Sequence, residues 1–254
     1  MCGTAAPSWL FPTPRNVSNL PPDDRYGKER RPITMAHDVR NRADVSALAG
    51  LRRRAFLLGS ISVVSAIASP ATASPNGLKL EMILRDPAAP VSGNPAGELT
   101  MVAFLDYNCP WCKKTAVPMS NAVSADGDVR MVYKDWPIIT PDSVEGARLA
   151  LAAKYQDAYH IVHDALMAIK TPKVKADEMR DTVRATSIDF ARLERDMKSK
   201  AAEIDDLLAR NHEQAMSLQL TGTPAFIIGK FLVPGAVQSA EAFTDLFKRA
   251  REQA

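Results

Sequence analysis

The sequence predicts an α/β fold with a long helical insertion, on three observations. Residues 99–107 form a continuous apolar run with β-branched and aromatic members, which is typical of a buried strand, and residues 128–136 alternate as a second strand. From residue 141 to about residue 219 the hydrophobic period changes to that of helices. Residues 225–233 then return to strand composition on either side of Gly229-Lys230, which predicts a β-hairpin.

The N-terminal part differs in composition from the rest. Residues 1–50 are rich in Pro, Asn, Asp and Arg without a sustained apolar period, so we expect a disordered extension, and Met35 is an alternative start. Residues 1–73 hold 10 Lys and Arg against 5 Asp and Glu, whereas residues 74–254 hold 22 against 24. The basic charge therefore belongs to the N-terminal end, and the body of the chain lacks the basic surface typical of nucleic-acid binding.

Residues 51–73 have the layout of a cleavable export signal. Three arginines precede a modest apolar run, and Ala71-Thr72-Ala73 supplies small residues for cleavage. The run is shorter than the roughly 20 residues that span a membrane. Residues 53–57 (RRAFL) resemble a twin-arginine signal; a general secretory signal and a buried core helix are the alternatives. We expect the mature domain to begin near Ser74 and to work in an oxidising compartment, the bacterial periplasm.

A Cys-x-x-Cys pair follows the first predicted strand. Cys109 comes directly after the strand, Pro110 follows, and a helix-competent stretch continues to about residue 125. Pro is favoured at the first helical position, because its missing N–H would be unpaired there. We therefore expect Cys109 at the helix N-cap, exposed at the strand end, with Cys112 one turn later and more buried.

By itself, this pair fits a metal site, a structural disulfide or two reacting thiols. A zinc site requires further Cys or His ligands, and the spacing of His160 and His163 suits a partly buried or surface position on a helix rather than a metal site. The chain has three cysteines. A secreted scaffold held together by disulfides has more than this, so a purely structural role for the pair is disfavoured. Reacting thiols are favoured, and no metal or other cofactor is expected.

The segment from residue 141 is predicted to open with one long amphipathic helix. Asp142 and Glu145 are spaced like a capping box at its start. Its apolar stripe consists of Val144, Ala147, Leu151, Tyr155, Tyr159, Val162 and Leu166. Further helices are predicted over residues 175–185, 189–199 and 201–218, and a last one over 240–251, capped by Ser239.

Three motifs together carry a family resemblance: FLDYNCPWCK, VYKDWPIITPDS and GTPAFIIG. Over about residues 80–254 the chain resembles the DsbA-type thioredoxin-fold proteins, and within them the exported bacterial subgroup with FDYNC and GTPAF motifs. The resemblance implies a thioredoxin fold with a helical insertion over about residues 141–219. It also implies a thiol–disulfide oxidoreductase whose only redox group is its own dithiol.

Within this fold the two cysteines have different expected roles. The thiolate is the reactive form of cysteine, and unpaired N–H groups and the positive end of the helix dipole favour it at a helix N-terminus. Cys109 is therefore the expected nucleophile, and Cys112 resolves the mixed disulfide by attacking Cys109.

The resemblance also assigns residues around the thiols. Pro224 matches the family's cis-proline opposite the active site, and an ordinary trans-proline loop is the alternative. The backbone of Thr223 is then free to pair with an extended substrate. Trp111, between the cysteines, offers an apolar docking surface or packs against the helical insertion.

Two departures from the family pattern concern charge near the thiols. Many relatives carry a buried acid six residues before the first cysteine, where this chain has Ala103. Asp106 and Lys134 are alternative organisers of a proton-carrying water, although surface charges are the more ordinary interpretation. Strong oxidants of the family usually have His beside the second cysteine, where this chain has Trp111.

We therefore expect an exported oxidoreductase that exchanges disulfides with cysteine-containing exported proteins. A membrane redox partner, DsbB-like or DsbD-like, would recharge its dithiol. The short segment before residue 99 favours a monomer. A periplasmic isomerase or reductase of the same fold is the nearest alternative, and a copper-binding module with soft thiolate ligands is another.

Overall fold

The computed structural model describes residues 15–16 and 75–253. The predicted export signal over residues 51–73 lies outside the described residues, as does the predicted extension over residues 1–50 apart from Arg15–Asn16. Within the described part of the chain, no helix is long and apolar enough to cross a membrane.

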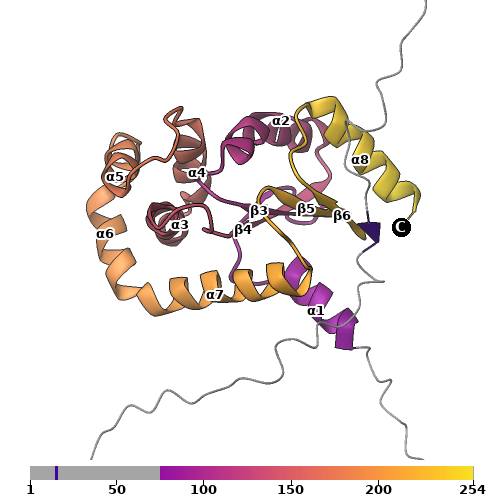
Figure 1. The fold of residues 1–254 in the computed structure, drawn as a ribbon, viewed down its shortest axis with the longest axis horizontal. Helices are drawn as coiled ribbons and strands as arrows, with labels where there is room; N and C mark the ends of the chain where they lie inside the picture. Colours follow the sequence, from indigo (N-terminus) through magenta and orange to yellow (C-terminus); the bar gives the residue numbers. More distant parts are fainter. Residues whose placement is uncertain (1–14, 17–74, 254) are drawn as a thin grey trace, which may run out of the picture. The chain divides into compact units, whose positions relative to one another are not determined.

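A six-stranded mixed sheet forms the centre of the fold (Figure 1). Its order is β1-β6-β5-β3-β4-β2. The central strands β3 and β4 are parallel, and every other neighbouring pair is antiparallel. The strands are β1 (Arg15–Asn16), β2 (Val91–Gly93), β3 (Leu99–Leu105), β4 (Val129–Asp135), β5 (Ala225–Ile228) and β6 (Phe231–Pro234). The two predicted strands and the hairpin are confirmed, whereas β1 and β2 were not expected.

Helices lie on both faces of the sheet (Figure 1). Those of the thioredoxin-like part are α1 (Pro75–Leu84), α2 (Pro110–Asp126) and α8 (Ala240–Glu252). The helical insertion consists of α3 (Asp142–Ala153), α4 (Tyr159–Ala168), α5 (Ala176–Arg184), α6 (Phe190–Ser199) and α7 (Ala201–Ser217). The fold is thus an α/β sheet interrupted by a helical insertion, as predicted.

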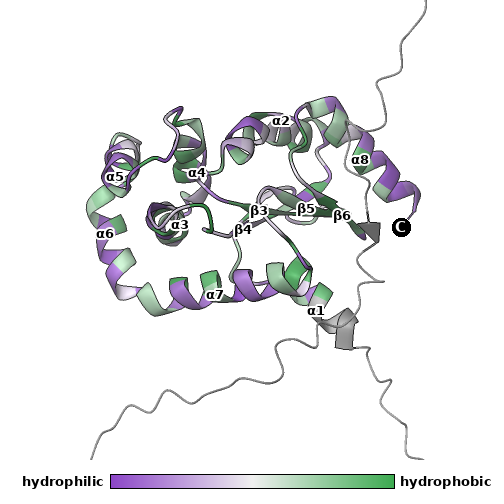
Figure 2. Cartoon of the chain, viewed as in Figure 1, coloured by the Kyte–Doolittle hydropathy of each residue, from purple (hydrophilic) through white to green (hydrophobic). Residues whose placement is uncertain are grey.

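Alternation along the strands divides the core between the two faces. Met101, Ala103 and Leu105 of β3 belong to the cluster that includes side chains of α2, α8 and α3 to α7. Val102 and Phe104 belong to a second cluster with side chains of α1 and α7. Figure 2 shows the central strands as hydrophobic and α8 as mixed in character.

The prediction of one continuous long helix from residue 141 is wrong, because this stretch forms two helices, α3 and α4. The chain leaves α3 through a 3-10 turn at Lys154–Gln156 and then Asp157, whose φ of 56° is left-handed. Asp tolerates this conformation better than most residues, but it ends a right-handed helix. Val162 and Leu166 of the expected stripe are nevertheless buried, now on α4.

The capping box at the start of α3 is also misplaced. Asp142 accepts a hydrogen bond from the backbone N–H of Ala176 at 3.2 Å. The reciprocal capping bonds link Thr140 and Ser143: each backbone N–H donates to the other's side-chain oxygen at 3.2 Å. At the last helix the prediction is confirmed, because the hydroxyl of Ser239 accepts from the N–H of Ala242 at 3.1 Å.

Candidate active site

The candidate site lies where β3 ends and α2 begins. Cys109 is the N-cap residue of α2, with φ −80° and ψ 115°, and Pro110 takes the first helical position, as predicted. The Cys109 sulfur accepts a hydrogen bond from the backbone N–H of Cys112 at 3.4 Å. The sequence therefore places the first thiol at the unpaired N–H groups of a helix.

Asp106 holds the chain just before the cysteines. Its carboxylate accepts hydrogen bonds from the backbone N–H groups of Asn108 at 2.7 Å, Ile138 at 2.7 Å and Ile139 at 2.8 Å. The hydroxyl of Ser143 donates to the same carboxylate at 2.8 Å. Four donors satisfy this buried group and tie the segment before Cys109 to the start of the helical insertion.

Asn108, the neighbour of Cys109, binds a second part of the insertion. Its side-chain oxygen accepts from the N–H of Val174 at 2.7 Å, and its amide group donates to the Val174 carbonyl at 3.1 Å and to Thr140 Oγ1 at 2.7 Å. Such a paired amide fixes the backbone on both sides of it. The position of Cys109 thus depends on contacts between its neighbour Asn108 and residues more than 30 positions away.

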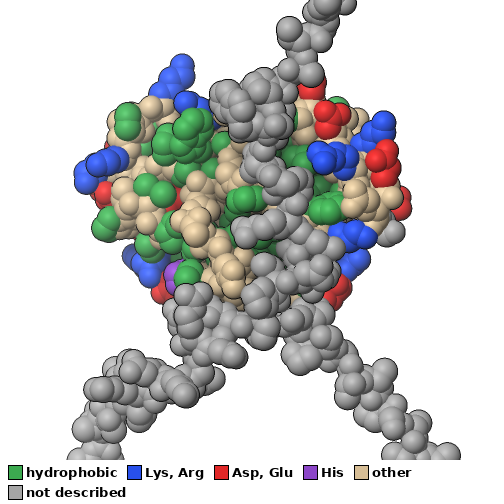
Figure 3. Space-filling model, turned by 45° about the vertical axis from the view of Figure 1, so that its right-hand side comes forward, with side chains coloured by type: hydrophobic (Ala, Val, Ile, Leu, Met, Phe, Trp, Pro, Cys, Tyr) green, Lys and Arg blue, Asp and Glu red, His purple; other side chains and the backbone are tan. Residues whose placement is uncertain are grey.

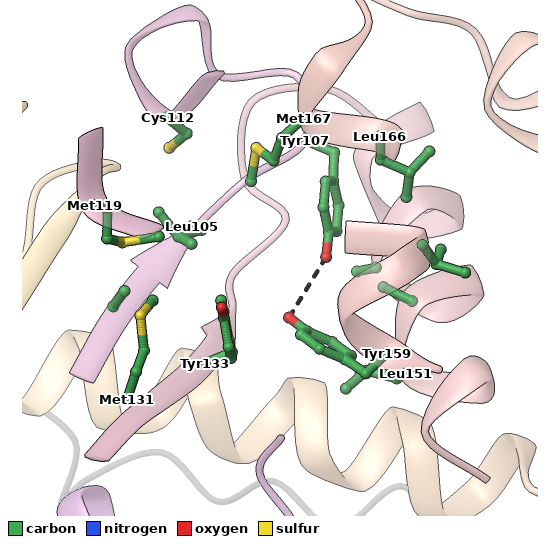
Figure 4. Close-up of a cluster of buried hydrophobic side chains, with 14 of the residues drawn as sticks. Leu105, Tyr107, Cys112, Met119, Met131, Tyr133, Leu151, Tyr159, Leu166 and Met167 are labelled. Carbon is green, nitrogen blue, oxygen red and sulfur yellow. Dashed lines mark hydrogen bonds between the residues drawn. The ribbon is translucent and has the colours of Figure 1, made fainter. Parts of the chain in front are cut away.

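Tyr107 connects the same segment to a buried polar cluster, and Figure 4 shows its hydroxyl pointing toward that of Tyr159. Its hydroxyl lies 3.0 Å from Nδ1 of His163 and 3.5 Å from the hydroxyl of Tyr159. Tyr159 in turn donates to both carboxylate oxygens of Asp135 at 3.1 Å. Burial raises the pKa of Asp135 to about 7 and lowers the pKa of His163 to about 3, so that this imidazole is neutral.

Both cysteines are buried free thiols, with exposed fractions of 2% for Cys109 and 0% for Cys112. The expected exposure of Cys109 is therefore wrong. The loop before β5 covers this thiol, which donates a hydrogen bond to the carbonyl of Thr223 at 3.2 Å. Because that loop is 114 positions away in sequence, a local pattern contains no signal for it.

The two thiols differ in acidity. The hydrogen bond from the Cys112 side chain, opposed by burial, lowers the pKa of Cys109 to about 6, with further help from the backbone N–H groups of Cys112 and Trp111. Burial raises the pKa of Cys112 well above its ordinary value. At neutral pH Cys109 is then a thiolate and Cys112 a thiol, which is the difference that the predicted roles require.

The fold places the expected Thr223–Pro224 segment beside the Cys109 sulfur. The Thr223–Pro224 peptide bond is cis, as the family resemblance implied. The Thr223 hydroxyl is buried without a partner among the described residues. Trp111 is 48% exposed, with Lys114 Nζ 4.6 Å from its ring centroid. The packed alternative for Trp111 is therefore not observed.

Neither Lys134 nor Asp106 is a surface charge, because both are buried. Lys134 lies on the face of the sheet that packs against α1 and α7, opposite the face of Cys112, and its Nζ is 2.8 Å from Asp86. The four hydrogen bonds that the Asp106 carboxylate accepts fix the segment between β3 and Cys109. A proton relay through either residue stays a prediction.

His163 is buried rather than partly exposed, and its Nδ1 lies within hydrogen-bond distance of the Tyr107 hydroxyl in the buried polar cluster. Among the described residues, no group of three His, Cys, Asp or Glu side chains is arranged to hold a metal ion. Within that part of the chain, Cys109 and Cys112 are the only cysteines that could serve the candidate copper site.

Sequence reasoning missed Asn108, Tyr107, Tyr159 and Asp135. The signal was polarity within a mostly buried stretch, as at Asn108, which lies between the buried Tyr107 and Cys109. Such a pattern indicates that a polar side chain is buried, and therefore hydrogen-bonded, but it does not identify the residue that binds it.

Solved structures with similar folds are oxidoreductases and disulfide-exchange proteins. A thioredoxin-like oxidoreductase from Silicibacter pomeroyi is 38% identical, with a TM-score of 0.64 over 68% of this chain and 98% of that chain. The thiol-disulfide exchange protein alpha-DsbA2 from Wolbachia pipientis is 26% identical, with a TM-score of 0.63 over 70% and 93% of the two chains. A periplasmic thioredoxin-like protein from Salmonella enterica serovar Typhimurium is 27% identical, with a TM-score of 0.57 over 68% and 95%.

Curated relatives include proteins named Na(+)/H(+) antiporter NhaA 1. The one from Mycolicibacterium gilvum is 25% identical over 160 residues, which is 61% of this chain and 26% of that protein. The chain thus spans about a quarter of the length of this relative, and the antiporter activity in its name is not carried over.

The sequence matches the DSBA-like thioredoxin domain over residues 100–247, more than half of the chain. This range contains both thiols, the helical insertion and the cis-proline loop. The chain belongs to the family of DsbA-like thioredoxin-domain oxidoreductases.

Proposed function

We propose that this chain is an exported thiol–disulfide oxidoreductase that exchanges disulfides with cysteine-containing proteins through Cys109-Pro110-Trp111-Cys112. The observation that carries the proposal is the pair of unequal thiols. Cys109 has a pKa of about 6, owing first to the hydrogen bond from Cys112, and the Cys112 thiol keeps its proton. A thiolate backed by a protonated second thiol suits two-step exchange.

In the reducing direction, the Cys109 thiolate attacks one sulfur of a client disulfide. The client S–S bond breaks, one client sulfur leaves as a thiolate and takes a proton, and a mixed disulfide with Cys109 forms. Cys112 then loses its proton and attacks the Cys109 sulfur. The second client thiol is released, and two electrons have passed from the dithiol to the client. Oxidation of a client dithiol runs through the same steps in reverse.

Thr223, Pro224 and Trp111 are the proposed client contacts. The carbonyl of Thr223 lies 3.2 Å from the Cys109 sulfur, beside the point where a client sulfur must arrive. An extended client backbone can pair with this segment in the manner of an added strand. The exposed Trp111 ring, two residues after Cys109, supplies an apolar contact. Asp106 is the better candidate for a proton-organising role, because Lys134 lies across the sheet.

Location and partners are part of the proposal. The signal-like residues 51–73 support export to the periplasm, and the periplasmic relative from Salmonella is consistent with it. A membrane protein of the DsbB-like or DsbD-like class would recharge the dithiol, and the working form is a monomer. Whether the chain oxidises, reduces or isomerises depends on its reduction potential against that partner.

Two cysteine variants test the proposal. Cys109→Ser should abolish insulin reduction, because the attacking sulfur is gone. Cys112→Ser should accumulate mixed disulfides with client proteins, detected by non-reducing electrophoresis. Release of clients by Cys112→Ser at the wild-type rate would show that the roles are wrong. Tight Cu(I) binding without insulin reduction by the wild-type chain would favour the copper module instead.

A further inference from the structure

A groove with a volume of about 740 Å³ opens between α2 and the end of α4. Pro110, the neighbour of Cys109, lines one part of it, and the segment Ala168–Lys170 after α4 lines another. This volume is in the range of roughly 300–1,000 Å³ that binding sites occupy. The groove is distinct from the Thr223–Pro224 loop, none of whose residues line it.

The groove has an apolar lining of Ala116, Val117, Met167 and Ile169. Val117 is 66% exposed, which is high for a large aliphatic side chain. It lies seven residues after Pro110, so that both belong to the same face of α2. An apolar path therefore leads from the edge of the thiol site along the helix.

The charged side chains of the groove are mostly basic. Lys113, Lys114 and Lys170 line it against a single acid, Asp164. Lys113 is held in place, because its Nζ donates to the carbonyl of Ile169 at 2.8 Å. A ligand with carboxylates near the rim would complement this charge.

We propose that this groove binds the client segment next to the reactive cysteine, and that it selects segments that combine apolar and acidic side chains. The inference rests on the proposed function. The Cys109 sulfur lies 3.2 Å from the Thr223 carbonyl, and Pro110, the next residue, lines the groove, so a client joined to Cys109 has the Thr223 loop and the groove as its neighbours. On the Pro110 side its chain enters the groove, where Val117 meets an apolar side chain and the lysines meet carboxylates.

The test compares two peptides in the full chain carrying Cys2→Ser, so that only the two site cysteines react. Each peptide has one cysteine activated as a mixed disulfide and flanked by leucines, with glutamates in one peptide and lysines in the other. Hydroxyethyl disulfide, which is small and neutral, reports on the thiols alone. The variant is Lys170→Glu, and the matched control is Lys248→Glu on the exposed side of α8.

Lys170→Glu should slow attack on the acidic peptide about fivefold at low salt and speed attack on the basic peptide, because a favourable charge contact becomes a repulsive one. The reaction with hydroxyethyl disulfide should stay unchanged. Lys248→Glu should leave all three rates unchanged. Val117→Asp should slow attack on the acidic peptide, because it removes the apolar contact and adds a repulsive charge, and its rate with hydroxyethyl disulfide shows whether the variant remains folded.

Three outcomes would overturn the inference. The first is an unchanged peptide preference in Lys170→Glu, and the second is an equal effect from Lys248→Glu. The third is a wild-type dimer that Lys170→Glu or Val117→Asp converts to monomer, since a second copy would then occupy the groove. Failure of the wild-type chain to react with hydroxyethyl disulfide would instead refute the proposed function itself.

Discussion

At the scale of single residues, the acidity of Cys109 depends on its neighbour as much as on its helix. The N-cap position alone predicts a lowered pKa through the helix N-terminus. In the structure the largest contribution to the pKa of about 6 is the hydrogen bond from the Cys112 side chain. Cys112 is therefore a donor that stabilises the Cys109 thiolate.

Removal of this donor should raise the pKa of Cys109. Cys112→Ala takes the donor away, so we expect a pKa clearly above about 6. Cys112→Ser keeps an O–H donor and should raise it less. The ultraviolet absorbance of the thiolate as a function of pH measures both values. A pKa that stays at about 6 in both variants would show that the helix N-terminus, not the Cys112 side chain, sets the acidity.

The dipeptide between the cysteines should set the redox potential. An oxidant is strong when its reduced thiolate is stabilised, and Trp111 offers no charged donor. We expect a potential above the roughly −270 mV of thioredoxin and below the roughly −120 mV of the strongest oxidant. Trp111→His should raise the potential in a glutathione equilibrium titration. An unchanged potential would exclude the dipeptide as its determinant.

At the scale of elements, a buried ion cluster joins three segments on the face of the sheet opposite the thiols. Asp86, which follows α1, lies 2.8 Å from Nζ of Lys134 on β4 and 3.0 Å from Nε of Arg210 on α7. Burial would raise the pKa of Asp86, but the bonds from Arg210 and Lys134 hold it below its ordinary value. Lys134 depends on this carboxylate because it is fully buried.

Asp86→Ala should lower the free energy of unfolding by about 3–5 kcal/mol, because it leaves the Lys134 charge buried without its partner. Adding Lys134→Met should recover much of the loss, since the uncompensated charge is then gone. Urea unfolding of the two variants and the wild type gives the comparison. A double variant as unstable as the single one would show that packing, not charge, accounts for the loss.

At the scale of the whole molecule, the segment before Cys109 couples the helical insertion to the sheet. Asp106, Tyr107 and Asn108 each bind a different part of the insertion. The charges visible on the face in Figure 3 are of both signs, as the near-balanced composition of residues 74–254 indicated. The pH dependence of stability is therefore best examined at Asp135, in the buried polar cluster with Tyr107, Tyr159 and His163.

The ionisation of Asp135 should make the free energy of unfolding fall as the pH rises from about 4 to about 7, whereas the buried neutral His163 acts in the opposite direction over this range. Asp135 keeps its proton in the folded state up to about pH 7, whereas in the unfolded state it ionises near pH 4. At this group the folded state then binds more protons between these values, and its contribution to stability decreases with pH there. Asp135→Asn, which retains an acceptor for Tyr159, should lack the Asp135 contribution, so that its free energy of unfolding changes more positively from low to high pH than that of the wild type.

Urea unfolding at pH 4.5 and pH 8 in both proteins measures this difference. The comparison with Asp135→Asn removes the contributions of the other titrating groups. The same change with pH in the two proteins would mean that Asp135 is ionised throughout.

The sequence by itself determined the features that depend on neighbouring residues. Apolar runs and periods identified β3, β4, the hairpin and most helices, because burial on one or both faces leaves a local pattern. Cys109 was recognisable as the N-cap residue of α2, because a strand end, Cys and Pro follow one another. The GTPAF motif located Pro224 through a family resemblance.

Only the tertiary structure decided which distant groups meet. The Thr223 carbonyl that covers Cys109 is 114 positions away, and Asp86 pairs with Lys134 from 48 positions away. The break at Asp157 and the burial of Lys134 ran against local expectation, because tertiary contacts compensate locally unfavourable choices. A buried polar residue must find a partner, but its own sequence neighbours do not specify that partner, since the partner comes from packing of the whole fold.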